Sequence, residues 1–229
     1  MKLAVIMPVL NEAAEIEAAL AALAVYRRRG VEVIVADGGS SDGTADLARP
    51  LADRVVSTAS GRAMQMNAGA AQARGDVLLF LHADTLLPED ADRLILDGLA
   101  GSRRVWGRFD VRIDGGALLG LIAIMINTRS RLTAIATGDQ AIFVTRAAFE
   151  AAGGFPAIAL MEDVALSARL KRLSRPLALR ARVITSPRRW RKHGTLRTML
   201  LMWRLRLEYF LGADPAKLAR AYGYSSAKN

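Results

Sequence analysis

The sequence predicts an α/β fold in which a mostly parallel sheet is flanked by helices. Three observations lead to this expectation. Short apolar runs alternate with amphipathic segments through the first hundred residues, and polar or acidic residues follow the apolar runs directly. Hydrophobic residues make up 52% of the 229 residues, enough to bury a full core. Strands that alternate with helices imply parallel pairing through right-handed crossovers.

In the first half, each apolar run predicts a strand and each segment with helical spacing predicts a helix. The first strand is expected to stop at Pro8, because proline cannot donate to a ladder. Ile16, Leu20 and Leu23 recur at helical spacing, and Gly30 ends that helix. The predicted strands are residues 3–7, 31–36, 55–56 and 77–81, and the predicted helices are residues 12–29, 44–51 and 62–74.

The second half is less regular. Residues 105–113 alternate in part, which indicates an antiparallel or edge strand. Residues 117–126 are apolar but too few to span a bilayer, so they form either a core helix, which we favour, or a helix that dips into a membrane. The remaining predicted elements are strands at 141–144 and 177–184 and a helix at 163–173.

A basic helix that also carries aromatic residues is predicted at residues 196–211. Such a helix either lies on a membrane or a partner, or packs on its own domain with arginine stems over apolar surface; the second is the simpler interpretation. We therefore expect one domain over residues 1–190, followed by a C-terminal helical extension over residues 191–229.

Composition excludes some classes of chemistry. The chain has no cysteine, so disulfides, thiolate zinc sites and cysteine nucleophiles are excluded. Residues 1–100 carry 9 Lys/Arg and 14 Asp/Glu, whereas residues 101–229 carry 23 and 8, so the net charges are −5 and +15. The basic half indicates either an anionic partner or a basic solvated face. No signal peptide is visible, because polar residues follow residues 3–9 at once, and we expect a cytoplasmic protein.

Four polar clusters fall where strands or helices should meet one edge of the sheet. Residues 8–12 follow the first strand, Asp37 the second, and Asp84 the run DVLLFLHAD, while Glu162 and Asp163 open a later helix. In an open α/β sheet such positions line one crevice. A carboxylate there can hold a divalent cation, and the cation can hold a diphosphate. The phosphate-binding patterns GxGxxG and GxxxxGK are missing, which disfavours dinucleotide dehydrogenases and Walker-type nucleotidases.

The combination of PVLNE, DGGSSDGT, Arg62-x-x-Gln65-x-Asn67, HAD, GDQ and ED resembles the family 2 glycosyltransferases of the GT-A fold, over roughly residues 1–190. The resemblance implies a Rossmann-like sheet with a donor-binding half at about 1–100 and an acceptor half at about 101–190. The tail, SPRRWRKHG followed by YFLGADPAKLA, resembles a bacterial subgroup named for arsenosugar biosynthesis.

The resemblance also implies roles for individual residues. The donor nucleotide would be held by Pro8, Asn11, Glu12, Asp37, Gly38, Arg62, Asn67 and Asp84. Asp37 matches the residue that contacts the base, and Asp163 matches the general base. Glu162, Arg189 and Trp190 fall near the acceptor or the diphosphate.

The metal-binding DxD motif of the family departs from its pattern here. It reads His82-Ala83-Asp84, so the first carboxylate is missing. We still expect Mg²⁺ or Mn²⁺ at Asp84. His193 is a candidate second ligand, although a lone histidine in a basic tail can equally be solvated or packed.

These residues together predict an inverting, metal-assisted glycosyltransferase. The expected donor is a nucleoside diphosphate sugar, a UDP-sugar first of all, and the acceptor is a hydroxyl; no nucleic acid is expected. Two alternatives stay open: a sugar nucleotidyltransferase, although its GxGxR loop is missing, and a non-catalytic membrane- or partner-binding protein on a degenerate GT-A fold. Peripheral contact with the inner face of the membrane through the basic C-terminal part also stays open, as does the oligomeric state.

Overall fold

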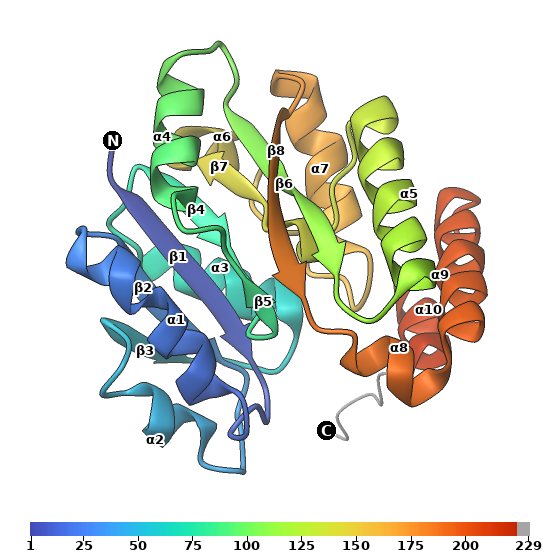
Figure 1. The fold of residues 1–229 in the computed structure, drawn as a ribbon, viewed down its shortest axis with the longest axis horizontal. Helices are drawn as coiled ribbons and strands as arrows, with labels where there is room; N and C mark the ends of the chain where they lie inside the picture. Colours follow the sequence, from blue (N-terminus) through green and yellow to red (C-terminus); the bar gives the residue numbers. More distant parts are fainter. Residues whose placement is uncertain (224–229) are drawn as a thin grey trace.

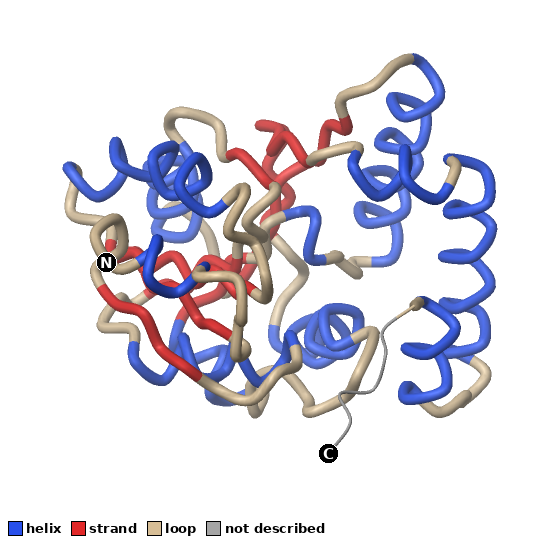
Figure 2. The backbone as a smooth tube through the Cα atoms, turned by 90° about the horizontal axis from the view of Figure 1, so that it is seen from below, coloured by secondary structure: helices blue, strands red, loops and turns tan. Residues whose placement is uncertain are grey.

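The computed structural model describes residues 1–223, apart from the side chains of Arg189 and His193. Within these residues the strands form one eight-stranded sheet in the order β3-β2-β1-β4-β7-β6-β8-β5 (Figure 1). The first four of these strands are parallel to one another, and helices cover both sides of the sheet (Figure 2). The predicted α/β class, with a mostly parallel sheet flanked by helices, is confirmed.

Seven of the eight strands within the described residues follow the predicted apolar runs closely, and β5 was not predicted. They are β1 (Leu3–Val9), β2 (Glu32–Asp37), β3 (Arg54–Ser57), β4 (Val77–Phe80), β5 (Thr85–Leu86), β6 (Trp106–Ile113), β7 (Phe143–Thr145) and β8 (Leu177–Thr185). The helices are α1 (Ile16–Arg28), α2 (Thr44–Ala48), α3 (Arg62–Gln72), α4 (Ala91–Ala100), α5 (Ala117–Thr133), the 3₁₀ helix η1 (Gly138–Gln140), α6 (Arg146–Ala151), α7 (Glu162–Leu173), α8 (Arg188–His193), α9 (Thr195–Phe210) and α10 (Pro215–Tyr222).

Strand β1 continues through Pro8 to Val9, so the prediction that it stops at Pro8 was wrong. The backbone C=O of Ile6 accepts a hydrogen bond from Leu81 and therefore faces β4. The backbone groups of residues two apart in a strand face the same neighbouring strand, so the ring nitrogen of Pro8 also points towards β4. The ladder between β1 and β4 ends at the pair Ile6 and Phe80, before Pro8 is reached. On the other side, β1 stays paired with β2 as far as Val9 and Asp37. A missing N–H costs no ladder bond at this position.

Strand β7 joins the two halves of the sheet. It runs antiparallel to β4 and to β6, and β6 in turn lies parallel to β8 with an irregularity between Phe109 and Asp110. The expectation that residues 105–113 form an edge strand was therefore wrong, while the antiparallel pairing was correct on the β7 side. Burial explains the position, because Trp106, Phe109 and Val111 are covered from both sides.

Two apolar layers hold the sheet between its helices. One layer packs α1 and α4 against alternate residues of the strands, such as Val5 and Val33, and packs α5 against β6 at Phe109 and Val111. The other packs α3, α6 and α7 against the intervening residues, such as Ile6 and Ile34. A third, smaller cluster joins α9 and α10 to the start of α7 through Leu205, Leu218, Met161 and Val164.

Helix α5 is longer than predicted and only partly a core helix. It buries Leu119, Ile122, Ala123 and Ser130, but several of its other apolar side chains are exposed. Helix α9 packs on its own domain through Leu205, as the simpler interpretation expected, and likewise leaves apolar side chains exposed. Within residues 1–223 no helix is both long and apolar enough to cross a membrane.

Candidate active site

The loops that follow β1 and β2 are bonded to each other at the carboxyl edge of the sheet. Asn11 adopts a positive φ of 54°, and its backbone N–H donates to Oγ of Ser40 at 2.9 Å. In return, the N–H of Ser41 donates to Oδ1 of Asn11 at 2.9 Å. The backbone N–H of Glu12 donates to Oγ1 of Thr44 at 2.9 Å. These bonds bring together the first two predicted clusters, residues 8–12 and the loop after Asp37.

Asp37 is a buried carboxylate with one free oxygen. The residue is 3% exposed. Its Oδ2 accepts hydrogen bonds from the N–H groups of Gly39 and Ser40 at 3.0 and 3.1 Å. Oδ1 is buried and has no partner within the described residues. Because buried carboxylate oxygens are nearly always hydrogen-bonded, this atom is suited to accept a donor from a ligand.

Gln65 supports the floor beneath this loop. Its Nε2 donates to the backbone C=O of Val9 at 2.6 Å and to that of Ala36 at 3.1 Å, so it fastens the ends of β1 and β2. A Cβ at Gly38 would lie 2.9 Å from Cδ of Gln65. A glycine at position 38 therefore allows Gln65 to pack closely against the backbone beside Asp37.

Arg188 connects α8 to the loop after β1. Its Nη2 lies 3.0 Å from Oε2 of Glu12, and its Nη1 contacts Oε1 of Glu15. Burial raises the pKa of Glu12, while the hydrogen bond and the charge of Arg188 act in the opposite direction. Trp190 is partly buried against the main core cluster. The first turn of α8 is thus anchored to the predicted donor region.

His82 and Asp84 follow β4 in the same crevice. A Cβ at Gly138 would lie 2.5 Å from Cε1 of His82, so the imidazole is packed directly against η1. Burial, followed by the charge of Arg62, lowers the pKa of His82 to about 4, although Asp84 and Asp163 oppose this shift. The imidazole is therefore neutral at physiological pH. Asp84 is partly buried, and its charge also acts on Glu12 across the crevice.

Glu162 and Asp163 form the first turn of α7. Met161, directly before them, has a positive φ of 70°, which turns the chain sharply into the helix. Asp163 accepts hydrogen bonds on both oxygens, from Gly138 N–H to Oδ2 at 2.8 Å and from Val164 N–H to Oδ1 at 2.7 Å. A carboxylate has about four lone-pair sites, so Asp163 retains the capacity to take a proton.

Glu162 differs from its neighbour in its degree of burial. It is 3% exposed, and its Oε1 lies 3.7 Å from Nη1 of Arg62. Burial and then the adjacent charge of Asp163 raise the pKa of Glu162 to about 7, while Arg62 acts to lower it. Arg62, His82, Gly138, Glu162 and Asp163 line one small cavity of about 10 Å³, which is close to the room that one water molecule needs.

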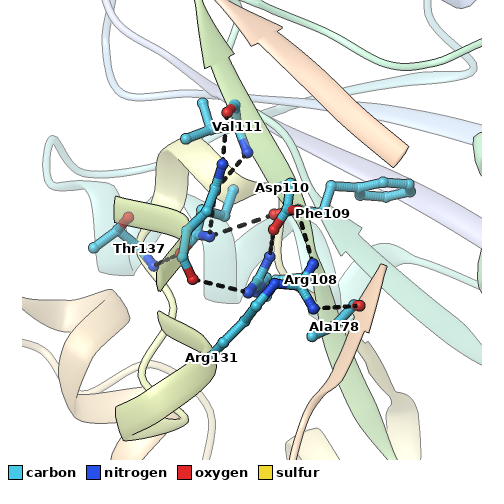
Figure 3. A network of polar contacts seen from close by, with 9 residues as sticks. Arg108, Phe109, Asp110, Val111, Arg131, Thr137 and Ala178 are labelled. Atoms are coloured by element: carbon cyan, nitrogen blue, oxygen red, sulfur yellow. Dashed lines mark hydrogen bonds and ion pairs between the residues drawn. The ribbon is translucent and has the colours of Figure 1, made fainter. Parts of the chain in front are cut away.

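A buried polar network holds η1 in place (Figure 3). Asp110 bridges two arginines: Nη1 of Arg108 contacts its Oδ1, and Nη2 of Arg131 lies 2.7 Å from its Oδ2. Nε2 of Gln140 donates to the C=O of Phe109 at 3.4 Å, and Oε1 of Gln140 accepts from the N–H of Thr137 at 3.3 Å. Through η1, this network fixes the backbone that contacts Asp163.

Arg129 and Arg206 add positive charge beside the candidate base. Nε and Nη2 of Arg129 and Nε of Arg206 are buried without hydrogen-bond partners within the described residues. Burial, followed by the charge of Arg206, lowers the pKa of Arg129 to about 10, whereas Asp163 and Asp139 favour its charged form. Because Arg129 belongs to α5 and Arg206 to α9, this charge interaction also relates the two helices.

The carboxylates of the crevice suit a metal that brings most of its own ligands. Among the side chains that the structure describes, which do not include that of His193, no three from His, Cys, Asp or Glu converge on one point. Asp84, with the neutral His82 nearby, is the donor set that could hold a cation here. This is the arrangement in which Mg²⁺ binds through one or two carboxylates and completes its coordination with water and substrate phosphates.

The structure brings most of the predicted residues together at one edge of the sheet. In Figure 1 the arrowheads of β1 and β6 point to this edge. Asn67 is engaged elsewhere, because its Nδ2 donates to the C=O of Phe155 at 2.8 Å and its Oδ1 accepts from the N–H of Phe155 at 3.0 Å. Arg189 and His193 lie in α8, but their side chains are outside the described part of the chain, so their predicted roles stay predictions.

Three residues of the site were missed by reasoning from the sequence. Gln65 and Gly138 belong to motifs that the sequence does show, RxxQxN and GDQ, but a motif does not reveal that Gln65 bonds to two strand ends or that Gly138 bonds to Asp163. Arg188 directly precedes the predicted pair Arg189 and Trp190. Several arginines stand together in this segment, and the sequence gives no signal that selects the one facing Glu12.

Comparison with known proteins now identifies the family. The model of the family described as Glycosyl transferase family 2 matches residues 4–148, more than half of the chain. The chain belongs to the family 2 glycosyltransferases. Its sheet and flanking helices are those of the GT-A fold found in glycosyltransferases of known structure.

The individual relatives of this family 2 glycosyltransferase share limited sequence identity with it or match only part of it. The succinoglycan biosynthesis protein ExoA of Rhizobium meliloti (strain 1021) is 35% identical over 111 residues, which cover 42% of this chain and 32% of ExoA. The chain thus matches about a third of the length of this curated relative. The structure of S. aureus TarS residues 1–349 has a TM-score of 0.68 at 20% identity, and the match covers 81% of this chain and 58% of that one. The mannosyltransferase PcManGT from Pyrobaculum calidifontis has a TM-score of 0.68 at 23% identity and covers 97% of this chain and 69% of its own.

Proposed function

We propose that the protein transfers a sugar from a nucleoside diphosphate sugar, with a UDP-sugar as the expected donor, to an acceptor hydroxyl with inversion at the anomeric carbon. The observation that carries the proposal is the free, buried Oδ1 of Asp37 at the carboxyl edge of the parallel strands. This atom is placed to accept a hydrogen bond from the base or the ribose of a nucleotide. TarS has been crystallised with UDP-GlcNAc and PcManGT with GDP-Man and Mn²⁺, which supports this class of donor.

Asp163 is the proposed general base. In the transfer step, the acceptor hydroxyl would give its proton to Asp163 as its oxygen bonds to the anomeric carbon, and the bond from that carbon to the diphosphate would break. A base placed in this way accelerates transfer by roughly 10²–10⁴-fold. The N–H groups of Gly138 and Val164 orient the carboxylate. One direct displacement inverts the anomeric centre.

Asp84 is the proposed residue that holds a divalent cation, and His193 is the predicted second ligand. When bound, Mg²⁺ or Mn²⁺ would neutralise charge that develops on the departing diphosphate, an effect worth several kcal/mol. On the protein side, Glu12 and Asp37 would bind the nucleoside, and Arg62 would lie beside the diphosphate with its guanidinium near Glu162. Pro8, Asn11, Gly38 and Asn67 would shape the donor pocket through the two bonded loops and α3. Arg189 and Trp190 would lie on the acceptor side.

A thermal-shift experiment tests the donor site directly. At a nucleotide concentration of 100 times Kd, binding adds about 2.7 kcal/mol, which corresponds to a rise in Tm of roughly 5–10 °C for a chain of this size. UDP or GDP with Mn²⁺ should produce this rise. Asp37→Asn should remove most of it, because the amide presents N–H groups where an acceptor is needed.

Asp46→Asn is the matched control, because Asp46 is an exposed aspartate of the next helix and forms an ion pair with the exposed Arg49. An equal rise in Tm for both variants would contradict the assignment of Asp37. Release of UDP or GDP from a panel of nucleotide sugars then identifies the donor. Release of pyrophosphate from a nucleoside triphosphate and a sugar phosphate would instead indicate a nucleotidyltransferase.

A further inference from the structure

Helix α9 presents an apolar stripe that nothing within the described residues covers. Its members follow one another at spacings of four and three residues, so they lie on one side of the helix. Their exposed fractions range from 49% at Trp203 to 70% at Phe210. The stripe consists of Leu196, Leu200, Trp203, Leu207 and Phe210. Another side of α9 is already used, since Leu205 is fully buried against the start of α7.

Helix α5 carries a second set of exposed apolar side chains beside the first. Ile124 is 61% exposed and Leu121 is 53% exposed, and the set also includes Leu118, Met125 and Leu132. Figure 1 shows α5 and α9 next to each other at one end of the molecule. Two contacts agree with this view: Arg129 and Arg206 interact electrostatically, and Met199 of α9 packs on the cluster that contains Leu119 of α5.

The same end of the molecule is strongly basic. Residues 117–133 and 188–210 together carry nine Lys/Arg and one Asp/Glu. Arg191, Lys192, Arg197 and Arg204 are exposed, and among these Arg204 pairs with Glu208 at 3.0 Å. Arg191 lies close to the start of α5, with Nη2 3.7 Å from where a Cβ at Gly115 would be. Apolar stripe and basic rim therefore belong to one continuous face, which we call the α5–α9 face.

A groove extends the α5–α9 face along α5. It has a volume of about 570 Å³ and is lined by Leu121 and Ile124 together with Arg112 and Arg182. Here too, apolar side chains and guanidinium groups stand side by side. Together with the stripe, the groove makes the exposed apolar area extensive, and extensive exposed apolar patches mark interaction sites.

We propose that the α5–α9 face docks on the surface of an anionic lipid bilayer, with the apolar stripe below the headgroups and the arginines at the phosphate level. Helices with an apolar side, an aromatic residue and a basic flank lie in the plane of such an interface. Charge decides between a bilayer and a second copy of this chain. Two copies joined through this face would bring together the exposed Arg191, Lys192, Arg197 and Arg204 of each copy, eight cationic side chains against two Glu208 carboxylates, whereas anionic lipids offset the charge.

Docking would also place the candidate active site close to the lipid surface. Helix α8 leads into α9, and its Arg188 pairs with Glu12 in the donor region. The membrane proposal itself does not depend on sugar transfer, because it rests on exposure and charge alone.

Co-sedimentation of the full chain with vesicles tests the proposal. The protein should co-sediment with vesicles of phosphatidylcholine that contain roughly 30% phosphatidylserine, a mixture of roughly physiological charge. Its affinity for vesicles of pure phosphatidylcholine should be at least tenfold lower. Raising the salt from 0.1 M to about 1 M should weaken binding, because it shortens the Debye length from about 10 Å to about 3 Å. Equal binding to both kinds of vesicle, or no binding to either, would overturn the proposal.

Variants locate the contact. Leu200→Gln with Leu207→Gln should reduce binding at least tenfold, since burial of even one leucine changes an equilibrium constant by about that factor. Arg197→Gln should reduce binding about fivefold. Leu173→Gln, at a leucine that is 50% exposed on α7, is the matched control and should leave binding unchanged.

Two further measurements separate the alternatives. Analytical ultracentrifugation without lipid should give the same mass for the wild type and the double leucine variant. If the wild type is instead a dimer, the variant is a monomer and the wild type does not bind vesicles, the face contacts a second copy and the lipid proposal is refuted. The Tm shift with UDP and Mn²⁺ should be equal in all these variants. Loss of vesicle binding with an intact shift is thus distinct from failure of the proposed donor site.

Discussion

The backbone N–H of Gly138 donates a 2.8 Å hydrogen bond to Oδ2 of Asp163, and this bond joins η1 to the first turn of α7. The two residues are 25 positions apart in the chain. Gly138 is the first residue of this 3₁₀ helix, which the buried side chain of Gln140 caps through Thr137. The same side chain bonds to the C=O of Phe109 in β6. The candidate base is therefore oriented by the core of the second half and not only by its own helix.

Asp163→Asn should abolish most of the transfer without unfolding the protein. The amide oxygen can still accept from Gly138, whereas the amide cannot take a proton from the acceptor. We expect a drop in turnover of roughly 10²–10⁴-fold with an unchanged nucleotide-induced Tm shift. Asp214→Asn is a suitable control, because Asp214 also accepts a backbone N–H at a helix start, that of α10. Turnover close to wild type in Asp163→Asn would rule out this residue as the base.

Glu162 should make the stability of the protein depend on pH. Its pKa is about 7 in the folded state and near 4.5 when unfolded, so between these values the folded protein binds the extra proton. Stability contributed by this group is complete below pH 4.5 and is lost as the pH rises to 7. We expect the free energy of unfolding of Glu162→Gln, relative to wild type, to increase by about 3 kcal/mol across this window.

Urea denaturation at several pH values between 4.5 and 8 measures this difference. Glu150→Gln, at an exposed glutamate of α6, should run parallel to wild type over the whole range. Parallel curves for Glu162→Gln as well would mean that Glu162 stays ionised in the folded protein.

Asp84→Asn should uncouple nucleotide binding from the metal. In the wild type, Mn²⁺ is expected to enlarge the Tm shift produced by UDP, since Asp84 would hold the cation and the cation would offset the charge of the diphosphate. The variant should give the same small shift with Mn²⁺ and with EDTA. Asp76 stands at the opposite end of β4, where its Oδ2 accepts from Lys2 N at 2.7 Å, and Asp76→Asn should keep the metal effect. Retention of the effect in Asp84→Asn would place the cation elsewhere.

Two glycines should respond to alanine with opposite signs. A Cβ at Gly107 in β6 would lie 2.3 Å from the backbone oxygen of Leu177 and 2.4 Å from Cζ of Phe143, so Gly107→Ala should cost about 3 kcal/mol or more. A Cβ at Gly120 in α5 meets nothing within 4 Å, so Gly120→Ala should stabilise the helix by about 1 kcal/mol. Thermal unfolding of both variants, compared with wild type, checks the signs.

The sequence was sufficient for the parallel half of the fold because burial there coincides with local pattern. Val77 to Phe80 is buried on both sides, so an uninterrupted apolar run marks the strand. Strand β6 was harder to place, because its neighbours β7 and β8 come later in the chain and pairing partners leave no local trace. The sequence favoured a core helix for α5 because apolar residues are usually buried. Several apolar side chains of α5 are exposed instead.

The site was predictable in its residue types but not in its bonds. The positions of Asp37, Asp84 and Asp163 after or between predicted elements were enough to expect one crevice. The free oxygen of Asp37 and the clamp from Asn67 to Phe155 depend on side-chain directions that only the folded chain defines. The pairing of Arg188 with Glu12 joins residues 176 positions apart, beyond the reach of any sequence pattern.

Because β7 lies between β4 and β6, the sheet of the first half is completed by a strand of the second half. A shortened chain that ended near residue 100 would leave the backbone N–H and C=O groups of β4 bare along one side, on a strand whose four residues are all apolar and buried. Bare apolar edges of this kind recruit further strands and aggregate. The first hundred residues are therefore not a module that can be excised or swapped, and chimeras of this protein should exchange surface loops and leave the sheet whole.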